Sequence, residues 1–305
     1  MYIYIYPRSM SLTKYFLVLS LVFSSLLSFS QSKDGTVFLK WKLKPKETLV
    51  YKTVMKEIDT VNHKDLSMDN MMRAIGVRDS THINEMRRLM TQLNKEIDKS
   101  DLVTKLTERR KGIVDIEMAI VDTSKEPISF KGRDADDSLR NIGRLFNKMS
   151  SGISLRGAVN EDGSLESFYI PNGQRNLVCL FFELPAKSIK PGDSWSLNTY
   201  LITLDQHFEC DTSYRKNQVI FNSLETINNE HIANIQYDIV DYASGDFKPP
   251  MSRESIKTTM KMTYRALAKF SIERGRWISY DGLMSLSSSG ISESQSTKKF
   301  SLIIQ

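Results

Sequence analysis

Three aspartates are the first residues whose spacing could support chemistry. Asp134, Asp136 and Asp137 lie close enough together to resemble a calcium loop. The glycine and the bidentate glutamate of an EF-hand loop are missing at the required positions. Acidic residues here also suit the N-terminus of the helix expected to follow, through capping and the helix dipole. We therefore expect no bound metal and no cofactor.

The histidines and nucleophiles give no better catalytic set. No two of His63, His82, His207 and His231 have the spacing of metal ligands on one helix. His207 and Cys210, in "HFEC", form the only local Cys–His pairing. The sequence has no G-x-S-x-G elbow, P-loop or Rossmann fingerprint. This pattern favours a protein that is not an enzyme.

Methionines are the candidates for a binding site. Five of the fourteen methionines fall in the segment 68–90, and Met86 and Met90 share the apolar stripe of a helix expected there. Met260 and Met262 belong to the apolar face of an expected strand. Methionine is flexible and polarizable, so it suits surfaces that accept varied apolar partners. We take these four as candidate ligand-binding residues, although an ordinary amphipathic helix covering a sheet face also explains the helical pair.

The segment 256–272 predicts the element that would position Met260 and Met262. Apolar residues occupy its even positions, while four odd positions are cationic: Lys257, Lys261, Arg265 and Lys269. This alternation over seventeen residues predicts a strand far longer than the usual five or six, which must bend around a core. One-sided alternation favours an antiparallel sheet. The segments 112–122 and 233–242 are also expected strands, and 298–305 is expected to close a sheet edge.

Two hairpins share one phrase. "EDGSLESF" begins at Glu161 and "ERGRWISY" at Glu273, and each has glycine in third place, Gly163 and Gly275. A tight β-turn accepts positive φ at such a position. Two more short sequences are repeated, in the same order along the chain. "KPKETL" begins at Lys44 and "KPGDSW" at Lys190, and "IVD" begins at Ile120 and again at Ile239.

These echoes predict a mainly β (α+β) protein of two related antiparallel lobes with strongly bent long strands. The first lobe spans 31–180 and carries a helical insertion at about 64–100, and the second spans 181–305. The distance along the chain between the two copies is not the same for each repeated sequence, and the insertion in the first lobe accounts for this difference. Chance similarity between β-hairpins is the alternative.

The N-terminus predicts export. Lys14 precedes the uncharged run "YFLVLSLVFSSLLSF", and Ser28 and Ser30 fit a cleavage site before Gln31. We expect residues 1–30 to be a signal peptide, with an uncleaved anchor as the alternative, and no transmembrane segment in the mature chain. The protein would then lie in the periplasm or outside the cell.

Cleavage would remove Arg8 and Lys14 and reduce the formal net charge from +6 to +4. The charges are mixed along the chain without a dense basic run, which argues against nucleic-acid binding. In an oxidising compartment Cys179 and Cys210 could form a disulfide or remain two separate thiols.

The segment "LPAKSIKPGDSWS" (184–196) resembles one found in a family of exported, β-rich Bacteroidota proteins of unknown function. In that family an LPxKxIKxGDxW turn follows a hairpin similar to "AVNEDGSLESF". The resemblance covers about 150–305 and implies no catalytic or binding residues. We interpret the chain as a non-catalytic binding or scaffolding module of the cell envelope that holds an apolar, lipid-like ligand or an envelope protein. The alternative is a hydrolase acting on envelope polymers.

Overall fold

The computed structural model describes residues 35–58, 101–121, 152–168, 172–248, 254–290 and 293–305. The expected signal peptide, the helical insertion at 64–100, and Met86 and Met90 lie outside these residues.

The described chain is mostly β, as predicted, with a single large antiparallel sheet and one short helix. The two-stranded pair β1 (Val37–Phe38) and β7 (Ser188–Ile189) lies apart from this sheet. The helix is α5 (Asn172–Phe182). The eleven strands of the large sheet are, in spatial order, β6 (Leu165–Phe168), β5 (Gly152–Asn160), β4 (Ile113–Val121), β3 (Asp101–Arg110), β2 (Thr48–Glu57), β13 (Ser294–Ile304), β12 (Arg276–Ser289), β11 (Ile256–Ser271), β10 (Glu230–Phe247), β9 (Phe208–Ile227) and β8 (Ser194–Trp195).

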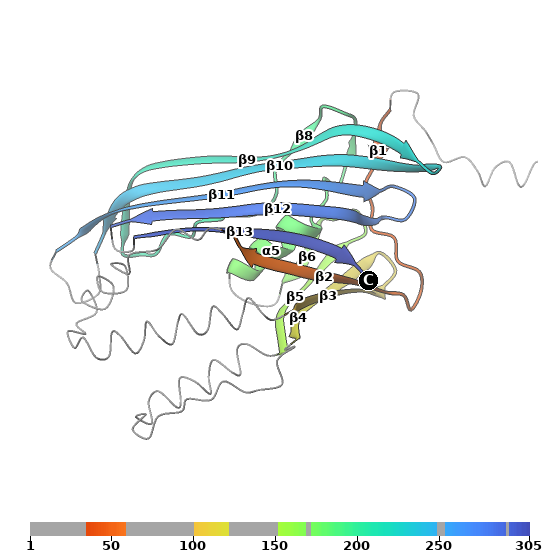
Figure 1. The fold of residues 1–305 in the computed structure, drawn as a ribbon, viewed down its shortest axis with the longest axis horizontal. Coiled ribbons are helices and arrows are strands. Elements are labelled where there is room, and N and C mark those ends of the chain that lie inside the picture. The colour runs from red at the N-terminus through yellow and green to blue at the C-terminus, as the bar shows by residue number, and fades with distance from the viewer. Residues whose placement is uncertain (1–34, 59–100, 122–151, 169–171, 249–253, 291–292) are drawn as a thin grey trace, which may run out of the picture.

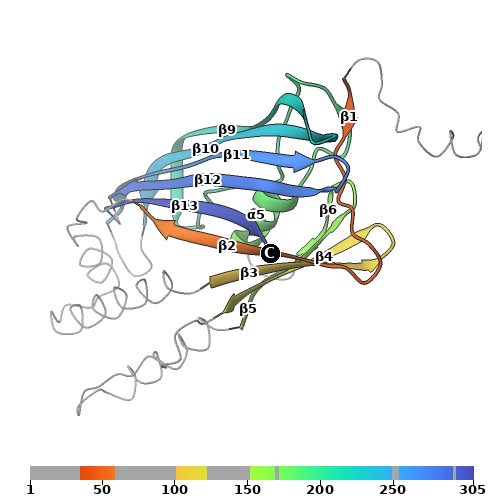
Figure 2. The ribbon, with the colours of Figure 1, turned by 45° about the vertical axis from the view of Figure 1, so that its right-hand side comes forward.

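The long strands bend around a core, as their alternation predicts. On β10 the side chains of Ile235, Tyr237 and Ile239 are buried. On β11 the even positions from Tyr264 to Phe270 are buried, and the odd positions between them are exposed. Figures 1 and 2 show the sheet curving over α5, which lies on its concave side. The concave face therefore holds the core.

The C-terminal strand does not close a sheet edge, which corrects the expectation for 298–305. β13 pairs with β12 through Leu302 and Tyr280 and with β2 through Leu302 and Thr53. It therefore joins the strands of the first half to those of the second. The edges of the sheet are β6 and β8. The backbone groups of β13 bond on both sides, so both halves share one continuous sheet.

Aromatic side chains form hydrogen bonds with the carbonyl groups at the C-terminal end of α5. The last carbonyls of a helix have no partner within it. Here Trp41 donates its indole N–H to the carbonyl oxygen of Phe182 at 2.9 Å, and Trp277 donates to Phe181 at 2.6 Å. The hydroxyl of Tyr280 donates to the carbonyl of Leu180 at 2.8 Å. The helix end is thus fully buried and still hydrogen-bonded.

The N-terminal segment bridges the two echoed hairpins. The amide of Trp41 donates to the carbonyl of Glu161 at 2.7 Å, and the amide of Lys42 donates to the carbonyl of Gly275 at 3.1 Å. A Cβ on Gly275 would lie 2.5 Å from the carbonyl oxygen of Lys40 and from the amide of Lys42. Glycine is therefore required here by close approach as well as by its φ of +60°.

The two "KP" turns have the same geometry. The amide of Glu47 donates to the carbonyl of Lys44, and that of Asp193 donates to Lys190, both at 2.9 Å. Each carboxylate in turn accepts the amide of its lysine, at 2.7 and 2.9 Å. The third residue of each turn has positive φ: +65° at Lys46 and +94° at Gly192.

Candidate functional site

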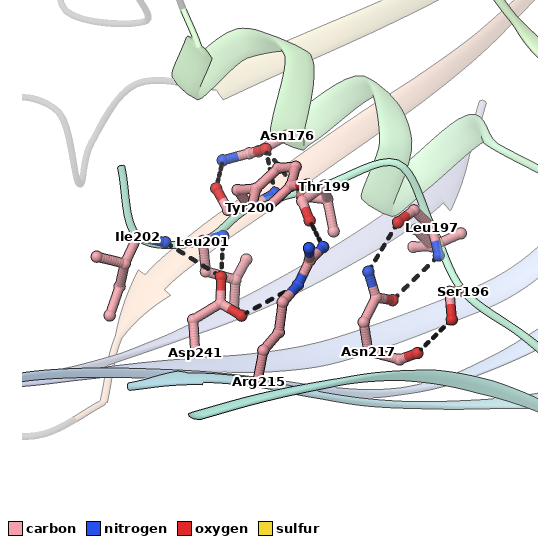
Figure 3. A network of polar contacts seen from close by, with 10 residues as sticks. All are labelled: Asn176, Ser196, Leu197, Thr199, Tyr200, Leu201, Ile202, Arg215, Asn217 and Asp241. Carbon is pink, nitrogen blue, oxygen red and sulfur yellow. Dashed lines mark hydrogen bonds and ion pairs between the residues drawn. The ribbon is translucent and has the colours of Figure 1, made fainter. Parts of the chain in front are cut away.

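The loop after β8 lies between α5 and the concave face of the sheet. Asn217 on β9 holds its start: its side-chain oxygen accepts the amide of Leu197 at 3.0 Å, and its side-chain nitrogen donates to the carbonyl of Leu197 at 2.7 Å. The hydroxyl of Ser196 donates to the backbone carbonyl of Asn217 at 2.7 Å (Figure 3). Three hydrogen bonds thus fix the loop to the sheet at this point.

Asp241 holds the loop from the inner face of β10. Its side chain is almost fully buried, and one carboxylate oxygen accepts the amides of Leu201 at 2.7 Å and Ile202 at 3.3 Å. The other oxygen lies 3.5 Å from the Nε of Arg215 on β9 (Figure 3). A buried carboxylate needs such donors to offset the loss of water. The guanidinium of Arg215 also lies 3.8 Å from the ring centroid of Tyr200.

Helix α5 holds the loop from the other side. Asn176 accepts the hydroxyl of Thr199 at 2.8 Å and the amide of Tyr200 at 3.1 Å, and it donates to the carbonyl of Tyr200. The thiol of Cys179 donates to the carbonyl of Asn198 at 3.1 Å. The loop is therefore clamped between helix and sheet.

Glu183, just beyond α5, adds a last contact to this clamp. Its carboxylate accepts the amide of Asn198 at 2.9 Å. Burial raises the pKa of Glu183 above its ordinary value, and this hydrogen bond and the charge of Arg175 offset part of the rise. Burial likewise raises the pKa of the Cys179 thiol, so the thiol is protonated and unreactive at neutral pH.

A half-open pocket of about 350 Å³ lies where this loop meets α5. Its lining residues are Arg175, Asn176, Tyr200, Ile202, Thr203 and Leu204. The Nε of Arg175 is buried and has no hydrogen-bond partner. Its guanidinium lies 5.3 Å from the ring centroid of Phe168. The pocket thus combines one cationic group, the polar residues Asn176 and Thr203, and apolar and aromatic side chains.

Beyond the loop, the concave face continues as a methionine shelf, which comprises Met260, Met262, Met284 and Leu286. All four side chains are only half buried. Asp241 pairs in register with Met262, which pairs with Leu286, and Tyr264 pairs with Met284. Since alternate residues share a face, the shelf extends the core face that Tyr264 occupies. Met262 and Met284 pack against that core.

The structure places Met260 and Met262 on one strand, where Met262 lies opposite Asp241 and Met260 lies opposite Ala243. The sequence analysis did not identify three residues of this site: Arg175, Arg215 and Asp241. Asp241 had a usable signal: it is the one charged residue on the buried face of β10, following Ile235, Tyr237 and Ile239. Arg175 and Arg215 had none, because their roles depend on the loop that packs over them.

Cys179 and Cys210 are both free in the structure. Cys179 is buried on α5, whereas Cys210 is exposed on β9. They are therefore two separate thiols, the second of the alternatives that the sequence left open.

Within the described ranges, no helix is long and apolar enough to cross a membrane. Across the same residues, no three His, Cys, Asp or Glu side chains are grouped so that they could hold a metal ion.

The fold and site together define a class: an open, bent antiparallel sheet with a helix and a clamped loop on its concave face. No protein-family model matches the sequence, and no curated protein matches it significantly.

Proposed function

We propose that the protein is an exported, non-catalytic binding module of the cell envelope that holds an apolar, lipid-like ligand against the concave face of its sheet. The observation that carries the proposal is the methionine shelf. There the core face of β11 and β12 continues as half-buried, adaptable apolar side chains. The pocket at the loop adds the apolar side chains of Ile202 and Leu204. Concave apolar surfaces with few polar groups are the usual sites for such ligands.

The chemistry of the pocket favours binding over hydrolysis. Hydrolysis of an envelope polymer calls for converging carboxylates or an activated nucleophile. No carboxylate is among the described residues that line the pocket, and the buried carboxylate nearest its loop, Asp241, is occupied by two amides and Arg215. Glu183, whose pKa burial raises, is likewise occupied by the amide of Asn198. Among the described residues, the carboxylates that contact this loop therefore serve to hold it.

The expected export places this binding module in the periplasm or outside the cell, where apolar molecules need a carrier between membranes. The run at 15–29 and the small residues Ser28 and Ser30 support a cleaved signal peptide. Mass determination of the protein purified from its own envelope tests this, because a chain beginning at Gln31 is expected and one retaining residues 1–30 would contradict it.

We also propose that the two halves are related by internal duplication. The support is the matched geometry of the turns at Lys44 and Lys190, including positive φ at Lys46 and Gly192. The hairpins at Gly163 and Gly275 add a second match, since both glycines have positive φ. The strands that follow each turn form antiparallel meanders in the same chain order.

Native mass spectrometry of residues 31–305 purified from the envelope, followed by organic extraction and lipid analysis, tests the binding function. We expect a stoichiometric apolar ligand. The variant Met262→Glu should lose it, because a carboxylate on the shelf would have to be desolvated beside the ligand. The matched control is Leu267→Glu on the same strand. Leu267 lies on the convex face and is 64% exposed, so this variant should keep the ligand.

The proposal would be overturned if the folded protein is purified without a ligand and also binds no fluorescent fatty acid. Circular dichroism of each variant separates ligand loss from unfolding, and Met260→Gln supplies a milder change on the same shelf. Scaffolding of an envelope partner would then become the leading function, and cross-linking in cells would identify that partner.

A further inference from the structure

Arg175 is the cationic side chain of the pocket, and one of its N–H groups lacks a hydrogen-bond partner. It lies in the first half of α5, lines the pocket, and has a buried Nε without a hydrogen-bond partner. A guanidinium offers N–H donors in a fixed fork that matches the oxygens of a carboxylate or a phosphate. Buried donors in folded proteins normally find an acceptor. An acceptor carried by a ligand would satisfy this one.

The other charged groups around the pocket are already engaged. Arg215 is paired with Asp241, and its guanidinium lies against the ring of Tyr200. Glu183, the acid that lies within electrostatic reach of Arg175, accepts the amide of Asn198. Arg175, whose guanidinium lies 5.3 Å from the ring centroid of Phe168 and close to Cys179 and Glu183, is thus the one charged side chain among the described residues that line the pocket.

The pocket lining also includes the apolar side chains of Ile202 and Leu204. Leu204 is 40% exposed there and Ile202 is half buried. The amide of Ile202 lies 3.3 Å from the carboxylate of Asp241, whose register partner on the next strand is Met262. An apolar chain that begins at Arg175 can therefore lie against Ile202 and Leu204, on the loop that Asp241 holds.

We propose that Arg175 binds the anionic head group, a carboxylate or a phosphate, of an amphiphile whose apolar chain lies along Ile202 and Leu204. This inference rests on the proposed function and adds the class of ligand to it. Selection acts through the head group, since the shelf itself accepts varied apolar chains.

Three probes with the same chain test it against residues 31–305: decanoate, decyl phosphate and decanol, titrated by calorimetry. We expect at least one anionic probe to bind about tenfold or more tighter than decanol, as a charge-assisted bidentate contact allows. Arg175→Gln should remove that preference while leaving decanol binding unchanged, and Arg175→Lys should retain part of it. Lys187→Gln, which removes an exposed charge elsewhere, should bind like the unmodified protein.

The relative affinity of the two anions distinguishes a carboxylate from a phosphate head group. Equal binding of all three probes, unchanged in Arg175→Gln, would overturn the head-group site and leave the proposed function standing. Failure of the folded protein to bind any of the three would overturn both.

Discussion

Trp277 donates its indole N–H to the carbonyl oxygen of Phe181 at 2.6 Å, across 96 residues of sequence. This bond joins the central sheet to the end of α5. The ring of Trp277 also packs edge-on against Trp41, whose own indole N–H bonds the next carbonyl of the helix. Because α5 carries Asn176 and Arg175, the same contacts position the pocket.

Replacing Trp277 by Phe should therefore lower the free energy of unfolding by about 1–3 kcal/mol, the cost of leaving a buried carbonyl without its partner. Denaturant unfolding measures it. Trp195→Phe is the matched control, because the indole nitrogen of Trp195 is buried and has no partner to lose. An equal loss in both variants would mean that ring volume, and not the hydrogen bond, stabilises the helix end.

Gly275→Ala should destabilise the protein more than Gly112→Ala. Both glycines have positive φ, so an alanine at either adds backbone strain of about 1–2 kcal/mol. Only at Gly275 would the added Cβ meet other atoms, at 2.5 Å from the backbone around Lys40 and Lys42, whereas Gly112 has open space. Thermal unfolding of the two variants decides this, and similar melting temperatures would contradict the close approach.

The matched "KP" turns should respond in opposite directions to exchanged residues. Lys46→Gly should stabilise the protein by up to about 1 kcal/mol, because glycine adopts positive φ without strain. The greater conformational entropy of glycine in the unfolded chain reduces this gain. Gly192→Lys should cost about 1 kcal/mol and still fold, since nothing lies within 4 Å of its added Cβ. Denaturant midpoints measure both. Misfolding of Gly192→Lys would show that the turns are not interchangeable.

Glu47 should make stability depend on pH in the acid range. The backbone N–H of Lys44 and the guanidinium of Arg276 hold the pKa of Glu47 below its ordinary value. A depressed folded pKa stabilises the protein above the unfolded value of about 4.3, and this contribution disappears as pH falls through the folded pKa. Compared with Glu47→Gln, the unmodified protein should be more stable by about 1 kcal/mol at pH 7.

That advantage should vanish toward pH 3. Denaturant unfolding of both proteins between pH 3 and 7 gives the difference directly, so that other titrating groups cancel. A difference that stays constant over this range would rule out a role for the carboxylate charge.

Local patterns were enough to predict the long strands. Alternation over 256–272 predicted β11 to within one residue of its end at Ser271, and the hairpin turns around Gly163 and Gly275 lie where the sequence predicted them. These features depend on neighbouring residues, since strand alternation and turn φ angles are set within a few positions. Met260 and Met262 were assigned to the apolar face of this strand for the same reason. Whether they hold a ligand remains a prediction.

Three features were decided only by the tertiary structure. The apolar run of α5 fits a buried strand as well as a helix, and it is stabilised as a helix by Trp41, Trp277 and Tyr280, which bond its last carbonyls from distant segments. β13 lies between β2 and β12 and not at an edge, because partners for both of its sides come from opposite ends of the chain. The pocket exists because a loop without regular structure is held by Asp241 and Asn176. The charge of Asp241 on a buried strand face indicates that it has a partner, but the sequence does not identify the loop that supplies it.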